Sequence, residues 1–101
     1  MKMDSIMECM NMTAYGGEAK SKAMLAIQRA REGDFDGAAA ALAESDEALA
    51  KSHAAHMALL SYDAANSDLR VTIFMVHAAD HLSSAETVRA LADEIIALHR
   101  R

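Results

Sequence analysis

The amino-acid sequence predicts an all-α fold: an antiparallel, up-down-up bundle of three helices in a single domain spanning residues 1–101. Proline is absent, glycine occurs only four times, and alanine, leucine, methionine and glutamate are abundant. This composition excludes a turn-rich β fold and favours long helices. Only two short joints interrupt the helical pattern, near residues 33–34 and 65–68, and short joints place consecutive helices antiparallel.

Both joints carry residues that suit the end of one helix and the start of the next. Gly33 suits a left-handed helix C-terminus, and Asp34 suits the N-cap of the following helix. At the second joint, the side-chain oxygens of Asn66, Ser67 and Asp68 can cap a third helix. Helices are therefore expected near residues 4–32, 35–64 and 69–100, each roughly 45 Å long.

The first predicted helix has a capping signal and an internal glycine pair. Ser5 and Glu8 have the spacing of a capping box. Gly16 and Gly17 should weaken the helix or allow another helix to pack closely against it. Cys9 and the methionines of this helix are expected to fill the core. A single cysteine forms no internal disulfide, which agrees with a reducing compartment.

Charge and hydropathy exclude two classes of function. The net charge of −5 lacks the basic footprint of a nucleic-acid-binding protein. No apolar run approaches the roughly 20 residues of a membrane span, so no direct membrane insertion is expected. The first residues, MKMDSIMECM, lack the continuous apolar stretch of a signal peptide, and a cytoplasmic protein is expected.

The third predicted helix carries two largely apolar stripes. One consists of Arg70, Ile73, Phe74, His77, Asp80, His81, Ser84, Val88, Leu91, Ile95 and Leu98, and is polar only in its middle. The other consists of Val71, Met75, Ala78, Leu82, Ala85, Ala92 and Ile96. Two sister helices cannot cover both stripes, and an aromatic content of 4% makes the core of one protomer thin. The pattern therefore favours an oligomer with this helix at its centre.

Three polar residues interrupt the first of these stripes. His77, Asp80 and His81 stand at positions i, i+3 and i+4, so they share one face of the helix. A neutral imidazole is a good nucleophile near pH 7 and can take and return a phosphoryl group. The same three side chains could instead hold a divalent metal, or simply fix the register of a bundle seam.

The second predicted helix adds two further imidazoles. His53 and His56 stand at i, i+3, and the later part of this helix can lie near the middle of the third helix. His53, His56, His77, Asp80 and His81 could then converge on one ion. An alternative reading of the chain is therefore a non-catalytic, metal-binding helical bundle, and a further alternative is an oligomeric assembly module with a polar register lock.

Several segments, in order, resemble a known protein family. They are AYGGEAKS at residues 14–21, EGDF at 32–35, AKSHAAHMALL at 50–60, VHAADHL at 76–82 and EIIALHR at 94–100. The most specific is VHAADHL, which is similar to Val-His-x-Gln-Asp-His-Leu. The chain thus resembles, over nearly its whole length, the lactose/cellobiose (N,N'-diacetylchitobiose) type IIA component of the bacterial phosphoenolpyruvate-dependent sugar phosphotransferase system.

The resemblance implies a mechanism and an assembly. The first histidine of the motif, here His77, would accept a phosphoryl group from phospho-HPr and pass it to the IIB component, which phosphorylates sugar entering through the membrane component IIC. Members of the family are homotrimers, nine-helix bundles in which the motif's aspartate, here Asp80, faces the threefold axis and can share Mg²⁺ with its copies. The transfer requires mainly positioning and charge neutralisation. Nearby hydrogen-bond donors can supply both, and the candidates to contact the phosphate or support His77 are His81, His53 and His56.

The chain departs from the family pattern at three places. Ala79 replaces the glutamine of the His-x-Gln-Asp-His motif, and His56 replaces the glutamine of the Ala-His-x-x-Gln stretch. Lys20 replaces an arginine, which keeps the positive charge and loses bidentate hydrogen bonding. His56 can still donate a hydrogen bond, whereas Ala79 cannot.

Overall fold

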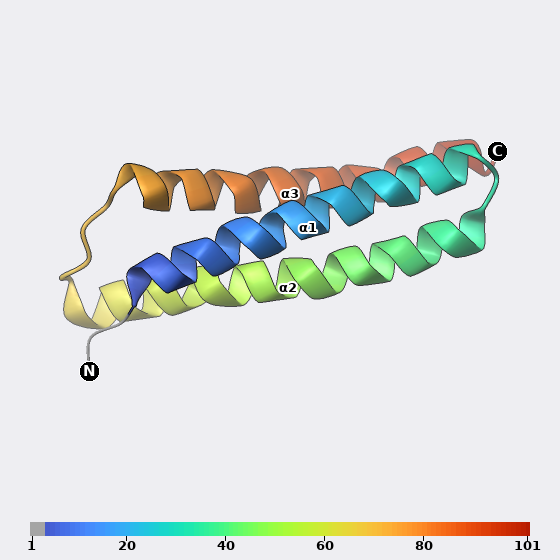
Figure 1. Ribbon diagram of the computed structural model, residues 1–101. Helices are drawn as coiled ribbons and strands as arrows, with labels where there is room; N and C mark the ends of the chain where they lie inside the picture. The colour runs from blue at the N-terminus through green and yellow to red at the C-terminus, as the bar shows by residue number, and fades with distance from the viewer. Residues whose placement is uncertain (1–3) are drawn as a thin grey trace.

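The computed structural model describes residues 4–101 and confirms the predicted fold. Three helices, α1 (Ser5–Arg31), α2 (Phe35–Asn66) and α3 (Ile73–His99), run up, down and up, so α1 and α3 are parallel (Figure 1). The bundle is a rod measuring 51 × 19 × 18 Å. Within the described residues, no strand occurs and no helix is long and apolar enough to cross a membrane.

The first joint is confirmed, and the start of α1 differs from the prediction. Gly33 has a φ of 84°, and the Gly37 N–H donates to Asp34 Oδ1 over 2.8 Å. At the other end of α1, the Met7 N–H donates to Asp4 Oδ1 over 3.0 Å, so Asp4 is the N-cap. Ser5 is then the first helical residue, and the predicted capping box of Ser5 is wrong, because the preceding carboxylate occupies the capping position.

The second joint lies where it was predicted, but the role of its residues as caps of α3 was predicted wrongly. Its polar residues complete α2 instead of starting α3, since Ser67 adopts φ 54° and its N–H donates to Asp63 O over 2.8 Å. Asn66 Nδ2 likewise donates back to Tyr62 O. Helix α3 begins later, at Ile73, where Thr72 Oγ1 accepts from the Met75 N–H over 3.2 Å. The same side-chain types satisfy either end of a helix, so composition alone placed α3 too early.

Helix α1 packs closely against both other helices. Small residues allow this approach, and the buried alanines are Ala19, Ala23, Ala26, Ala30, Ala38, Ala41, Ala48, Ala55, Ala78, Ala85 and Ala92. Two fully buried serines of α2 bond to α1: Ser45 Oγ donates to Ala19 O over 2.7 Å, and Ser52 Oγ donates to Met12 O over 2.8 Å. These bonds satisfy both hydroxyls, and the α1–α2 register is thereby fixed.

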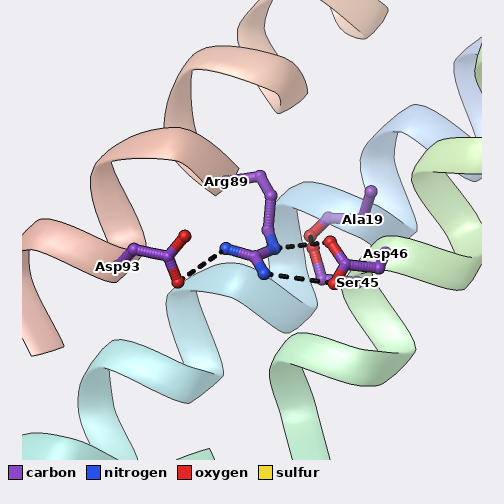
Figure 2. Close-up of polar contacts among 5 residues, drawn as sticks. All are labelled: Ala19, Ser45, Asp46, Arg89 and Asp93. Carbon is purple, nitrogen blue, oxygen red and sulfur yellow. Dashed lines mark hydrogen bonds and ion pairs between the residues drawn. The ribbon is translucent and has the colours of Figure 1, made fainter. Parts of the chain in front are cut away.

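Helices α2 and α3 pack against each other much less extensively, and one arginine links them (Figure 2). Arg89 of α3 donates from Nε to Asp46 Oδ1 over 2.6 Å and from Nη2 to Asp46 Oδ2 over 3.1 Å. Its Nη1 lies 3.0 Å from Asp93 Oδ1. The hydrogen bond to Asp46 is the main cause that raises the pKa of Arg89. This bidentate contact joins α3 to α2.

One of the two α3 stripes forms the core, and the other is open. The stripe that forms the core includes the buried residues Ala78, Leu82, Ala85, Ala92 and Ile96. On the opposite face, the apolar residues Ile73, Val76, Leu91 and Leu98 are exposed, Ile73 by 86%. The core prediction for α1 holds for Cys9 and Met12 and is wrong for Met7, Met10 and Met24, which are exposed. A single protomer therefore leaves a long apolar face uncovered.

Candidate functional site

His77, Asp80 and His81 lie in the first half of α3, where α3 packs on α1. Ala78 and Leu82, buried against Cys9 and Met12 of α1, fix how this segment is rotated about its axis. The adjoining histidines and aspartate are consequently turned outward: His77 and Asp80 are exposed, and His81 is half-buried. The site is thus held by a packed helix and is accessible to a partner.

The two imidazoles of this segment contact each other. Nε2 of His81 lies 3.1 Å from Nε2 of His77, and the rings stand edge to face with centroids 4.6 Å apart. In this pair one Nε2 donates and the other accepts, so the pair holds one proton between the two nitrogens when both rings are neutral. An exposed imidazole oriented by a hydrogen-bonding neighbour is an arrangement suited to a nucleophile.

Gly16 of α1 lets the backbone of α3 approach at this level. A Cβ at Gly16 would lie 3.4 Å from the carbonyl carbon and oxygen of His81 and 3.4 Å from Ser52 Oγ. The predicted close packing at the glycine pair is confirmed for Gly16. At Gly17 a Cβ would meet nothing within 4 Å, so the second glycine has no packing reason inside the protomer.

The histidines of α2 lie apart from the α3 pair. His53 Nδ1 is 3.9 Å from Glu86 Oε1, and His56 lines a cavity of about 200 Å³ between α2 and α3. Ala79 lines the same cavity, so the two positions at which the chain lacks the family's glutamines lie together. His77 does not line that cavity.

The predicted convergence of five metal ligands is wrong. Among residues 4–101, no group of three or more histidine, cysteine, aspartate or glutamate side chains is placed to hold a metal ion. The physical reason is the rotation of α3 about its axis. Ala78 and Leu82 pack on α1 while Glu86 and Arg89 face α2, so His77 and His81 lie on the edge of α3 away from α2. His53, His56, His77, Asp80 and His81 therefore do not form one centre within a protomer.

Arg89, which joins α3 to α2, was not predicted from the sequence. Arg89 and Asp93 have readable i, i+4 spacing, which indicates an ion pair. Their partner Asp46 lies 43 positions earlier, and no local signal connects it to Arg89. The α2–α3 contact could be found only from the packing of the whole bundle.

Comparison with known proteins agrees with this arrangement. Residues 7–100 match the family described as "PTS system, Lactose/Cellobiose specific IIA subunit". The chain belongs to this family. It is similar to the lichenan-specific phosphotransferase enzyme IIA component of Bacillus subtilis (strain 168), with 39% identity over 86% of this chain and 79% of the relative. The N,N'-diacetylchitobiose-specific EIIA component of Escherichia coli (strain K12) is 35% identical over 91% and 79%.

Solved structures of IIA components share the fold. The cellobiose-specific enzyme IIA from Bacillus anthracis superposes with a TM-score of 0.92 at 30% identity, covering 99% of this chain and 92% of that one. The IIA(chitobiose) subunit of a complex with HPr gives a TM-score of 0.83 at 30% identity, covering 98% and 96%. This chain is accordingly a IIA component of the sugar phosphotransferase system.

Proposed function

We propose that this IIA component is a cytoplasmic phosphocarrier whose His77 accepts a phosphoryl group from phosphorylated HPr and passes it to a IIB component, which serves a membrane IIC component. The observation that carries the proposal is the exposed His77 ring, held 3.1 Å from His81 on a packed helix. The similarity to a IIA(chitobiose) subunit solved together with HPr supports the choice of donor.

The transfer is a displacement at phosphorus between two imidazoles. A ring nitrogen of His77 attacks the phosphorus of the donor's phosphohistidine with its lone pair; the new N–P bond forms as the donor's N–P bond breaks, and the donor imidazole leaves with the electron pair. Transfer to the IIB component reverses the role of His77, which becomes the leaving group. Such chemistry depends mainly on in-line positioning and on neutralising the phosphoryl oxygens.

His81 is the supporting group within the same protomer. Its Nε2–H can donate to the His77 ring before transfer and to a phosphoryl oxygen afterwards, because the two Nε2 atoms are only 3.1 Å apart. His53 and His56 lie on the α2 side of the protomer. Any support that they give to a phosphoryl group would therefore reach it from an adjacent protomer of an oligomer.

The uncovered face of α3 supports the proposed homotrimer. Ile73, Leu91 and Leu98 are exposed on the same side of the helix as Asp80, so burying this apolar face around a threefold axis would bring three Asp80 carboxylates together. Like charges this close need protons or a cation. Asp80 has no ion-pair partner among residues 4–101, and three carboxylate oxygens with waters suit Mg²⁺. The ion would neutralise the axis and stabilise the trimer.

The phosphocarrier role is tested by intact mass. The protein is incubated with phosphoenolpyruvate, enzyme I and HPr, and wild type is compared with His77→Ala and with His99→Ala, a control at the far end of α3. One acid-labile phosphoryl group on wild type and on His99→Ala, and none on His77→Ala, is expected. Phosphorylation of His77→Ala, or of none of the three proteins, would contradict the proposal.

The assembly is tested by sedimentation equilibrium. We expect wild type to sediment as a trimer with Mg²⁺ and to dissociate partly in EDTA at neutral pH, because the Asp80 carboxylates then repel one another. Asp80→Asn removes this repulsion and should remain a trimer in EDTA. A protomer mass for wild type under all conditions would refute the trimer, and a wild-type trimer that EDTA leaves intact would refute the metal.

A further inference from the structure

The edge of α1 beside the histidine pair holds an exposed lysine with no acidic partner. Lys20 is exposed and makes no ion pair or hydrogen bond among residues 4–101. The neighbouring lysine of this helix behaves differently, since Lys22 Nζ lies 2.8 Å from Glu44 Oε2. A cation beside a phosphoryl-transfer histidine can bind the phosphoryl oxygens. Lys20 can do so only if it lies next to the histidine pair.

The contacts of α1 show which of its edges faces α3. Lys22 pairs with Glu44 of α2, and Tyr15 lies under Lys51 of α2, so this edge of α1 faces α2. At 100° per residue, Gly17 and Lys20 lie on the opposite edge, the α3 side. On α3, Glu86 and Arg89 face α2, which places the His77–His81 edge on the α1 side by the same reasoning. The two edges therefore border the same α1–α3 seam.

The level of Lys20 along the bundle is also fixed. Gly16 lies against the His81 backbone, and Ala19 shares a buried cluster with Ala85, one turn beyond His81. Helices α1 and α3 are parallel, and helical side chains tilt toward the N-terminus of their own helix (Figure 1). The flexible stem of Lys20 can therefore reach back from the level of Ala85 toward the histidine pair.

Gly17 leaves space between this lysine and the pair. It is one turn before Lys20 on the same edge, and its missing Cβ would meet nothing within 4 Å. We propose that Lys20 and Gly17 form the second wall of the phosphoryl-transfer site, with Lys20 binding the phosphoryl oxygens on His77 and Gly17 providing the room in which the phosphoryl group and its donor approach. The inference rests on the proposed function of His77.

In this site, the Lys20 ammonium group neutralises the negative charge of the phosphoryl oxygens during transfer. Within residues 77–81, the polar side chains are two imidazoles and the Asp80 carboxylate, which is itself anionic. The transferring phosphoryl group needs a cation, and a lysine acts as a point charge that follows the group from donor to acceptor. Arginine at this position would provide the same charge.

The test uses phosphoramidate as the donor, alongside phospho-HPr. Phosphoramidate transfers its phosphoryl group to the His77 ring as its own P–N bond breaks and ammonia leaves, so no partner protein is required. Intact mass gives the rate of phosphorylation for wild type, Lys20→Gln, Lys20→Arg and Lys51→Gln. The last variant is the control: it removes the same charge from α2, on the far side of α1.

We expect Lys20→Gln to be phosphorylated on the order of tenfold more slowly than wild type, and its rate to lose most of its dependence on salt concentration. The rate for Lys20→Arg should stay within about threefold of wild type, and the rate for Lys51→Gln should be unchanged. Gly17→Ala should slow transfer from phospho-HPr without lowering Tm. Equal rates for Lys20→Gln and Lys51→Gln would overturn the proposal, as would absence of phosphoramidate labelling on wild-type His77. Failure with phospho-HPr alone would refute the donor and leave the Lys20 result standing.

Discussion

The two adjacent glycines of α1 allow one substitution to be compared in two environments. Valine at Gly16 would place its Cβ 3.4 Å from the His81 carbonyl and Ser52 Oγ, with γ-methyl groups beyond it. Valine at Gly17 would point into open space. The intrinsic helix propensity changes equally at both sites and slightly favours valine over glycine. The difference in unfolding free energy between the two variants therefore isolates the packing of α1 on the histidine segment.

The expected difference follows from overpacking costs. Forcing extra methyl groups into a well-packed interface costs about 1–3 kcal/mol, whereas Gly17→Val should change stability by no more than about 0.5 kcal/mol. With an unfolding entropy of about 2.1 cal/mol/K per residue, 101 residues give about 0.21 kcal/mol/K. Gly16→Val should then melt about 5–14 °C below Gly17→Val.

Differential scanning calorimetry at one fixed protein concentration measures this difference, since a concentration change would shift the Tm of an oligomer. Gly16→Ala serves as a graded control, because a bare Cβ at 3.4 Å needs only a small adjustment of its neighbours. Gly17→Val and Gly16→Ala should both melt above Gly16→Val. Equal Tm values for the two valine variants would refute the close approach of α1 to His81.

Other contacts give predictions of different sizes. Leu82→Ala removes a side chain that is 2% exposed and should cost about 2–5 kcal/mol in a denaturant titration; a loss under 1 kcal/mol would mean that Leu82 is not core. Arg89→Lys should cost under about 1 kcal/mol, because the Asp46 side chain is 57% exposed, and a larger loss would show that the α2–α3 link is stronger than an exposed pair. Burial, with a smaller effect of Glu8, raises the pKa of the Cys9 thiol. The unfolded thiol therefore ionises first, so unfolding should become easier as pH rises through about 8.5, and less so in Cys9→Ala. Native Cys9 should also resist iodoacetamide, and rapid native labelling would contradict its burial.

The sequence predicted the features that depend on local rules. Gly33 and Asp34 end and begin helices through backbone conformation and a capping carboxylate, and both are where the pattern placed them. The second joint was also predicted in place, but α3 was predicted to start too early because Asn66 and Ser67 carry groups that satisfy a helix C-terminus as readily as an N-terminus. Thr72, the actual N-cap, has the same chemistry without any neighbouring signal.

The sequence predicted which residues form the candidate site, but it did not predict how the helices place them in space. The i, i+4 spacing places His77 and His81 in contact, and the structure has them 3.1 Å apart. Which face of α3 would be buried could not be read from the sequence, because both stripes are largely apolar. The expected helix order placed His53 and His56 near His77, yet the packing of Ala78 and Leu82 on α1 turns the α3 pair away from α2.

The carrier role is tested most directly by a complete cycle. The protein is phosphorylated through HPr, freed of HPr and phosphoenolpyruvate, and then mixed with a IIB component of the cellobiose type, and both masses are followed with time. Phosphorylated His77 should return to the unmodified mass as the IIB component gains one phosphoryl group, with His77→Ala inert throughout. A phosphoryl group that stays on this chain, or leaves only by hydrolysis at the rate seen without the IIB component, would contradict the account.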